Sequence, residues 1–514
     1  MKKIAGSALG VVVVLGALST AGAWYTGQQL PAVLETSIQQ ANQDMGKSLP
    51  ALGLSATIEL VSLERQLFSS NARYRIQFAG SLDGESPSHF EWFVSDRIEH
   101  GPFPLSRLQT LKLLPVMATS NYALERSPEL EKWFAGSQGG APLQGQVSLG
   151  YDRSLSGKLA AQPLQMALDE QTQIDFSGLE IDFDSGANLE TISASGMMDS
   201  FKVNSTLASD QSMRLEFKGM NLSSNTRKGV SDFYLGQNEV RLQQIELQIG
   251  DSAPILFKDF VQRDETSEAN QQLSARYSYD VGMIRYQGND IGSSQMLWTV
   301  KNLDAAALQS MVELYGTLLQ SGKVDSESAM PQLSDEQAAQ FKTDLEKLLA
   351  GKPGLALERL AFKTANGESS FSFALDLDKP ASFDLPAPEL AKQLIAQLDA
   401  QLRVSKAMIA DMVGVQAAIA GETDKEAIAQ QAVMVGEMAS GMAVASELAV
   451  VQGEDISSSL HYANAQLTFN GKQMTVEQFV ALAINSGGGL AGMGHKAPAD
   501  KPLLDESEGE SSVQ

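Results

Sequence analysis

The stretch that decides the fold is IDFSGL at residues 174–179, because related stretches follow it at regular intervals: LEFKGM at 215–220, ILFKDF at 255–260 and, less closely, WTVKNL at 298–303. Their third residues, Phe176, Phe217, Phe257 and Val300, lie 41, 40 and 43 positions apart. A period of this size fits a unit of several short strands stacked along an axis. Such a repeat predicts an elongated sheet rather than a closed globule. Chance similarity among amphipathic strands is the alternative explanation.

The repeated stretches also predict a surface. Period-two alternation places each third residue on the same face as the apolar residue two positions before it: Ile174, Leu215, Ile255 and Trp298. A sheet with one apolar face must bury that face against something. No long amphipathic helix occurs between residues 144 and 302. We therefore hypothesise an apolar trough in the sheet, lined by Phe176, Phe217, Phe257 and Val300. In the alternative, helices later in the chain cover this face and make an ordinary core.

The remainder of the chain predicts an α+β protein, mainly antiparallel, with several helices packing on the sheet. Helical spacing of apolar residues covers 30–49, and period-two alternation covers 56–62, 73–78 and 90–94. After residue 304 helices alternate with strands. We expect helices to begin at the capping boxes Ser334/Gln337 and Thr423/Glu426, and hairpin turns at 366–367 and 470–471. We also expect a helix over 388–398 before a strand at 401–404, one strand over 460–469, and a final helix ending at Ile484.

These patterns divide the chain into five parts. We expect a membrane anchor or signal segment at 1–25, a strand-and-helix region at 26–143, a repetitive β region at 144–303, a mixed helix and strand region at 304–484, and a disordered acidic tail at 485–514.

The N-terminus predicts export. Lys2 and Lys3 precede a run from Ile4 to Ala23 without a charged residue, and Trp24 and Tyr25 follow it. The run is long enough to cross a bilayer as a helix, and aromatic residues suit the far interface. Alternatively, residues 21–23, Ala-Gly-Ala, mark the cleavage site of a signal peptide. Both interpretations place the body of the protein outside the cytoplasm.

Composition excludes several classes of function. The 514 residues include no cysteine, which excludes disulfides, thiolate metal sites and thiol catalysis. The net charge of −24 argues against nucleic acid as a partner and against binding anionic lipid through bulk charge. Burial of apolar surface must therefore provide the stability of the exported body.

The sequence contains no clear catalytic or metal-binding motif. Its four histidines, His89, His100, His461 and His495, show no metal-ligand spacing. His100 precedes the rigid turn Gly-Pro-Phe-Pro, so a structural role at this turn explains it better than a functional one. Local hydrogen bonds are the better explanation for His461. Residues 180, 182 and 184 are acidic and share one strand face, which suits a solvated surface better than glycoside chemistry. We expect no catalytic residue, no metal and no cofactor.

One helix offers a second candidate surface. Met434, Met438 and Met442 recur every four residues and form one adaptable apolar stripe. The stripe either packs on the sheet or forms a groove for a partner.

Three motifs give the chain a resemblance to a known family. They are GAWYTG at 22–27, HGPFPL at 100–105 and YANAQLTFNGKQM at 462–474. With these motifs, in this order and at this spacing, the chain resembles the YdgA-like family of bacterial envelope proteins. Ala465 stands where the family pattern has a glycine. The resemblance implies an inner-membrane anchor and a periplasmic body, and it implies no catalytic residues.

Together these observations predict a non-enzymatic envelope protein on an N-terminal transmembrane helix. Its body would bind or transfer a lipid or another amphiphile. The alternative is a structural or assembly protein that contacts envelope partners, including further copies of itself, through sheet edges.

Overall fold

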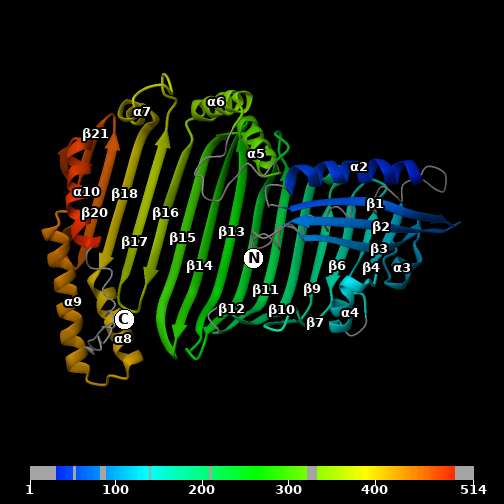
Figure 1. The fold of residues 1–514 in the computed structure, drawn as a ribbon, viewed down its shortest axis with the longest axis horizontal. Coiled ribbons are helices and arrows are strands. Elements are labelled where there is room, and N and C mark those ends of the chain that lie inside the picture. Colours follow the sequence, from blue (N-terminus) through cyan, green and yellow to red (C-terminus); the bar gives the residue numbers. More distant parts are fainter. Residues whose placement is uncertain are drawn as a thin grey trace, which may run out of the picture.

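The computed structural model describes residues 30–49, 54–66, 68–80, 88–137, 140–207, 211–320 and 333–491. In these ranges one antiparallel sheet of 22 strands runs the length of the molecule, accompanied by nine α-helices (Figure 1). The prediction of an α+β protein with a large antiparallel sheet is confirmed. The expected anchor at 1–25 lies outside the described residues, and no described helix is long and apolar enough to cross a membrane.

The helices are α2 (Leu30–Ser48), α3 (Leu105–Gln109), α4 (Glu131–Gly136), α5 (Ala305–Gln320), α6 (Asp335–Ala350), α7 (Ala387–Leu394), α8 (Lys406–Ala420), α9 (Lys425–Ala445) and α10 (Val476–Ala491). The strands are β1 (Leu54–Arg65), β2 (Ser69–Gly80), β3 (Ser88–His100), β4 (Ala118–Leu124), β5 (Leu143–Leu149), β6 (Leu155–Ala161), β7 (Leu164–Ala167), β8 (Thr172–Phe176), β9 (Leu179–Ser185), β10 (Thr191–Thr206), β11 (Ser212–Lys228), β12 (Tyr234–Ile249), β13 (Ile255–Ala269), β14 (Gln272–Tyr286), β15 (Asn289–Asp304), β16 (Gly354–Lys363), β17 (Glu368–Leu377), β18 (Ile395–Ser405), β19 (Val450–Gln452), β20 (Asp455–Ala463), β21 (Gln466–Phe469) and β22 (Lys472–Met474).

The topology is a meander. Each strand pairs with the strand before it in the chain, with two exceptions. Strands β8 and β9 lie end to end along β10, and β7 and β6 lie end to end along them. Strand β20 pairs with both β18 and the short β19. No crossover connection is needed, because neighbouring strands are antiparallel. Short hairpins join β10 to β15, whereas α5 and α6 lie between β15 and β16, and α8 and α9 lie between β18 and β20.

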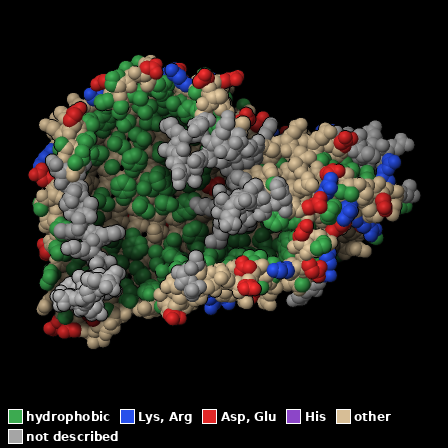
Figure 2. All heavy atoms as spheres, viewed as in Figure 1, with side chains coloured by type: hydrophobic (Ala, Val, Ile, Leu, Met, Phe, Trp, Pro, Cys, Tyr) green, Lys and Arg blue, Asp and Glu red, His purple; other side chains and the backbone are tan. Residues whose placement is uncertain are grey.

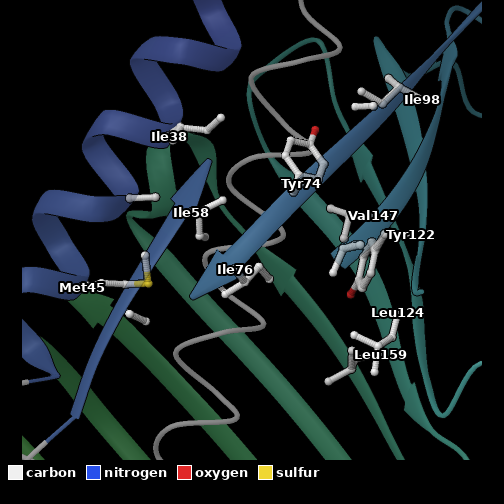
Figure 3. Close-up of a cluster of buried hydrophobic side chains, with 14 of the residues drawn as sticks. Ile38, Met45, Ile58, Tyr74, Ile76, Ile98, Tyr122, Leu124, Val147 and Leu159 are labelled. Atoms are coloured by element: carbon white, nitrogen blue, oxygen red, sulfur yellow. The ribbon is translucent and has the colours of Figure 1, made fainter. Parts of the chain in front are cut away.

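The N-terminal region, residues 30–185, encloses a packed core. Helix α2 lies on β1 and directs Ile38 and Met45 toward Ile58 and the strands beyond it (Figure 3). Strands β2 to β6 and β9 complete the enclosure, and the cluster contains 21 buried apolar residues. Alternating apolar positions in β1 and β2 account for this burial, since every second side chain points inward.

Beyond this region the sheet opens. Strands β10 to β15 are 15 to 17 residues long and stand side by side (Figure 1). The described helices lie at the rim: α5, α6 and α7 at one end of the strands, and α8, α9 and α10 toward the C-terminal edge. Ala305 of α5, for example, packs on Leu235 and Leu273 at strand ends.

The repeat of the sequence corresponds to a feature of the backbone. Gly178, Gly219, Asp259 and Asn302, each two residues after the aligned Phe or Val, all have left-handed backbone angles, with φ of 99°, 61°, 53° and 60°. From the second stretch onward the unit is a hairpin of two long strands, β11 and β12 or β13 and β14, rather than the several short strands that we expected.

The left-handed residues interrupt the alternation of side chains. In β11 the apolar positions shift from Leu215 and Phe217 to Met220 and Leu222, on the other side of Gly219. At Asn302 the register with β14 shifts by one, so that Val300 and Leu303 both lie opposite residues on one face of β14. In these strands the same face of the sheet therefore carries apolar side chains both before and after the left-handed residue.

Four details of the C-terminal part differ from the sequence predictions. The helix expected over 388–398 ends at Leu394, because Ile395 already pairs with Leu377 of β17 and so begins strand β18. Asp424, not Thr423, caps α9 through its side chain. Residues 460–469 form two strands, since Asn464 and Ala465 make a turn with φ of 51° and 60°. Helix α10 continues to Ala491, past the expected end at Ile484. The capping box at Ser334 and Gln337 is confirmed.

Candidate functional site

The apolar face of the open sheet is built from rows of side chains that cross the strands. Phe176, Phe217 and Phe257 lie in one row, together with three residues that the sequence did not single out: Phe201, Ile245 and Ile284. Directly opposed residues of antiparallel strands share a face. The rings of Phe176 and Phe201 are 6.1 Å apart, and those of Phe201 and Phe217 are 6.4 Å apart. The row therefore continues unbroken from β8 to β14.

Val300 does not lie in this row. It is opposite Ala275 in β14 and Leu355 in β16, because hairpin lengths and the bulges between β14 and β15 set the register there. Its own row runs to the C-terminal edge: Val300, Leu355, Leu375, Leu398, Tyr462 and Leu467. The neighbouring row contains Trp298, Leu357, Phe373, Ala400, Leu460 and Phe469. The four sequence-selected residues thus belong to two rows rather than one.

These rows are only partly covered. Phe176, Phe217, Phe257 and Val300 are all half-buried. Four large apolar side chains on the same face retain more of their surface: 37% for Tyr277, 39% for Leu355, 40% for Leu360 and 42% for Leu402. Figure 2 shows hydrophobic side chains gathered over the hollow of the sheet. Among the described helices none packs along β10 to β14.

The other face of the sheet is charged. Ion pairs join Arg263 to Glu239 at 2.5 Å and to Asp280 at 3.7 Å, and Lys218 to Glu216 at 3.2 Å. A hydrogen bond from Arg241 lowers the pKa of Glu239. A polar hollow of about 470 Å³ lies among these side chains, next to Arg276. Cations and anions alternate there, so the hollow has no dominant charge to attract an ionic ligand.

Two titratable groups outside this face, Asp96 and Tyr74, are buried in the N-terminal core. Asp96 is 2% exposed and accepts a hydrogen bond from Ser120 Oγ at 2.7 Å, and burial raises its pKa to about 6. Burial raises the pKa of Tyr74, and the nearby Asp96 carboxylate raises it further. These groups lie inside the N-terminal core, where no substrate reaches them.

Among the described side chains, the histidines and acids singled out by the sequence lie apart, and the side chains of His89 and His495 are outside the described part. His100 Nε2 is 3.1 Å from Ser70 Oγ, and His461 Nδ1 is 2.7 Å from Asp399 Oδ1 at an exposed position. Of the acids on β9, Asp182 forms an ion pair with Lys158 at 2.8 Å. Within the described part of the chain no group of three metal-ligating side chains comes together.

The methionine stripe of α9 does not pack on the sheet. Ala432, Gly436 and Ser440 form the buried face of α9, which lies against α8. The small side chains let α8 and α9 approach closely. The opposite face of α9, which carries the methionines, therefore points away from α8. Met434 and Met438 are 69% and 59% exposed.

Comparison with known proteins confirms the resemblance that the three motifs indicate. The family model described as "Bacterial protein of unknown function (DUF945)" matches residues 1–477. The chain is 26% identical to Protein YdgA of Escherichia coli K12, over 92% of this chain and 95% of that protein. It is 21% identical to the uncharacterized protein YihF of the same organism, over 93% and 98%. It is 22% identical to an uncharacterized protein of Haemophilus influenzae, over 62% and 87%.

Proposed function

Because this chain belongs to the DUF945 family of bacterial proteins, which brings no assigned activity with it, we propose a function from its surface: the open sheet binds a lipid or another amphiphile along its apolar face. In this proposal the protein is not an enzyme. The uncharged run at 4–23 anchors it in the inner membrane and the body lies in the periplasm.

One observation carries the proposal, namely the continuous apolar rows on a face that no described helix covers along β10 to β14. Leaving a phenylalanine or leucine side chain in water forfeits about 1.5–3 kcal/mol relative to burying it. Part of this cost recurs along the rows from Phe176 to Ile284 and from Val300 to Leu398, whose members are only partly buried, whereas Tyr462 and Leu467 at the C-terminal end are buried beneath α10. Acyl chains are long and apolar, so they match a hollow that extends across many strands. Transfer along the hollow would use the same apolar face, which continues across the change of row between β14 and β15.

Photo-crosslinking tests the proposal inside cells. The regular strand β17 offers a matched pair: Phe373 on the apolar face, opposite Leu357 and Ala400, and Ser372 on the other face, opposite Gln401. A photoreactive phenylalanine analogue at position 373 in the full-length protein should yield adducts with the mass of a lipid. The same analogue at position 372 should yield none.

The result also separates the alternative function. If position 373 gives no lipid adduct while sheet-edge positions crosslink to an envelope protein, the structural or assembly function replaces this proposal. Mass spectrometry of lipids extracted from the purified full-length protein provides an independent reading, in which a stoichiometric amphiphile supports binding.

A further inference from the structure

We infer that the loop from Gly101 to Met117, here called the leucine loop, is a second contact with the membrane: a surface that docks on a bilayer containing anionic lipid. This inference does not depend on what the open sheet binds. It rests on exposure, on rigidity and on charge, and each is visible in the described residues.

The leucine loop carries the densest group of exposed apolar side chains in the described part of the N-terminal region. Leu111, Leu114 and Leu113 are 81%, 78% and 64% exposed. Phe103 and Leu105 are more than half exposed. Phe68 adds a sixth side chain that is 78% exposed, and its carbonyl accepts a hydrogen bond from the backbone of His100 at 2.9 Å. Monomeric soluble proteins rarely expose such groups unless the surface binds a partner or a membrane.

The loop is held rigidly while its leucines face outward. The Arg107 guanidinium is buried and donates hydrogen bonds to Ser148 Oγ at 3.0 Å and to the Leu114 carbonyl at 3.3 Å. The Glu99 carboxylate accepts hydrogen bonds from the backbone and hydroxyl of Ser106. Gly101 is needed at the base, because a Cβ there would meet the Val116 carbonyl oxygen at 1.9 Å. The outward side chains are therefore presented by a fixed frame, not by a collapsing loop.

Charge favours a bilayer as the occupant. The protein has 62 acidic residues, yet none occurs between Glu99 and Glu125. The exposed charged residue of the loop is Lys112, since Arg107 is buried. A protein of net charge −24 is repelled by anionic headgroups over most of its surface. An apolar loop with a lysine and no acid is the part of the surface that such a bilayer admits.

Helix α9 provides the contrast. Its exposed methionines are flanked by Glu426 and Glu437, and α9 lies at the opposite end of the long axis from α3, the helix of the leucine loop (Figure 1). An equally apolar surface with acids beside it does not suit an anionic bilayer. Leu114 and Met434 have similar exposure, 78% and 69%, so they form a matched pair.

The absence of cysteine makes the test direct. Full-length Leu114→Cys and Met434→Cys variants are each labelled with an environment-sensitive fluorophore and reconstituted in vesicles of phosphatidylcholine and phosphatidylglycerol with brominated acyl chains. The label at position 114 should shift to shorter wavelength and lose most of its emission to the bromine atoms. The label at position 434 should do neither. Adding Leu113→Ser to the first variant should weaken partitioning about tenfold, as expected for one buried leucyl side chain, without changing the unfolding midpoint.

Two results would overturn the inference. One is a label at position 114 that the brominated chains quench no more than the label at 434. The other is a label at 114 that is shielded from aqueous iodide in cells yet unquenched by lipid, which would assign the loop to a protein partner. In vesicles of phosphatidylcholine alone, partitioning should weaken about fivefold rather than vanish, because the contact of Lys112 with an anionic headgroup, about 1 kcal/mol, is lost while the apolar side chains remain. Neither result bears on lipid adducts at Phe373, so the two proposals fail independently.

Discussion

The N-terminal region and the open sheet are both built from strands with alternating apolar side chains, but they bury these side chains to different extents. In the first, strands β1 to β6 and β9 with α2 enclose 21 buried apolar residues. In the second, the strands from Thr191 to Asp304 are longer, yet only Met198, Leu235, Leu242 and Leu273 are buried apolar residues among those described. Alternating sequences build both regions. What differs is whether a described layer covers the apolar face. Such a layer buries the apolar side chains of the first region, whereas many of those in the second region stay partly exposed among the described residues.

The largest effect that distinguishes the two regions is the cost of truncating a buried side chain. Ile98 is fully buried in the N-terminal core. Ile98→Ala should lower the free energy of unfolding by about 2–5 kcal/mol, through lost burial and a residual cavity. Fluorescence of Trp92 and Trp133, whose rings are 5.8 Å apart in this core, reports the transition in a Trp24→Phe/Trp298→Phe background. An unchanged unfolding midpoint would contradict the packed core.

A pH effect of somewhat smaller size should be confined to the N-terminal region. Folded Asp96 has a pKa of about 6, raised first by burial, whereas unfolded aspartate ionises near 3.8. Below pH 3.8 both states are protonated, and above pH 6 both are ionised. Between these values the unfolded state loses its proton first, so stability falls as pH rises, by about 2–3 kcal/mol in total.

Asp96→Asn removes this dependence. The amide oxygen can still accept from Ser120 Oγ. The stability difference between Asp96→Asn and the unsubstituted protein, measured by urea unfolding, should grow in favour of the variant between pH 4 and pH 8. A difference that is the same at both pH values would show that Asp96 does not titrate in this range.

On the open sheet, the same kind of truncation should cost little. Leu402 lies on the apolar face and retains 42% of its surface. Leu402→Ser should lower the free energy of unfolding by less than about 1.5 kcal/mol, because only part of the side chain leaves an apolar environment. It should, however, reduce the amount of lipid that purifies with the protein. A loss of stability as large as that of Ile98→Ala would mean that another layer covers this face.

The smallest effect concerns a turn at the far edge of the sheet. Asn464 and Ala465 join β20 to β21 with positive φ at both positions, a conformation that favours glycine at the second. Ala465→Gly should raise stability by up to about 1 kcal/mol by removing strain at a left-handed alanine. Slower amide hydrogen exchange in β20 and β21, measured by mass spectrometry, would register the gain, and faster exchange would refute it.

The sequence predicts where the strands lie along the chain better than it predicts the register in which they pair. Period-two alternation identifies the strand-rich stretch from Gln144 to Asn302 correctly, because side-chain alternation is a local property. It does not identify Phe201, Ile245 or Ile284, because antiparallel partner strands run in the reverse direction and a forward repeat does not include them. Register depends on hairpin lengths and bulges, which is why Val300 falls outside the row of Phe257.

Exposure is harder still to predict. The methionine stripe of α9 is visible in the sequence, but which face packs is decided by the small residues Gly436 and Ser440 against α8. The leucine loop contains only the short helix α3 among its described elements. That its leucines point outward follows from the buried Arg107, a tertiary contact that no local pattern contains.

The meander has a consequence for how the chain is made. Since each strand from β10 to β15 pairs with its predecessor, the contacts that build this part of the sheet are close in sequence, and closing each hairpin fixes only a short loop. A chain emerging N-terminus first can complete its compact region and then add one strand after another to the growing edge. In this order each long strand from β10 to β15 can pair as soon as it emerges with the strand made just before it.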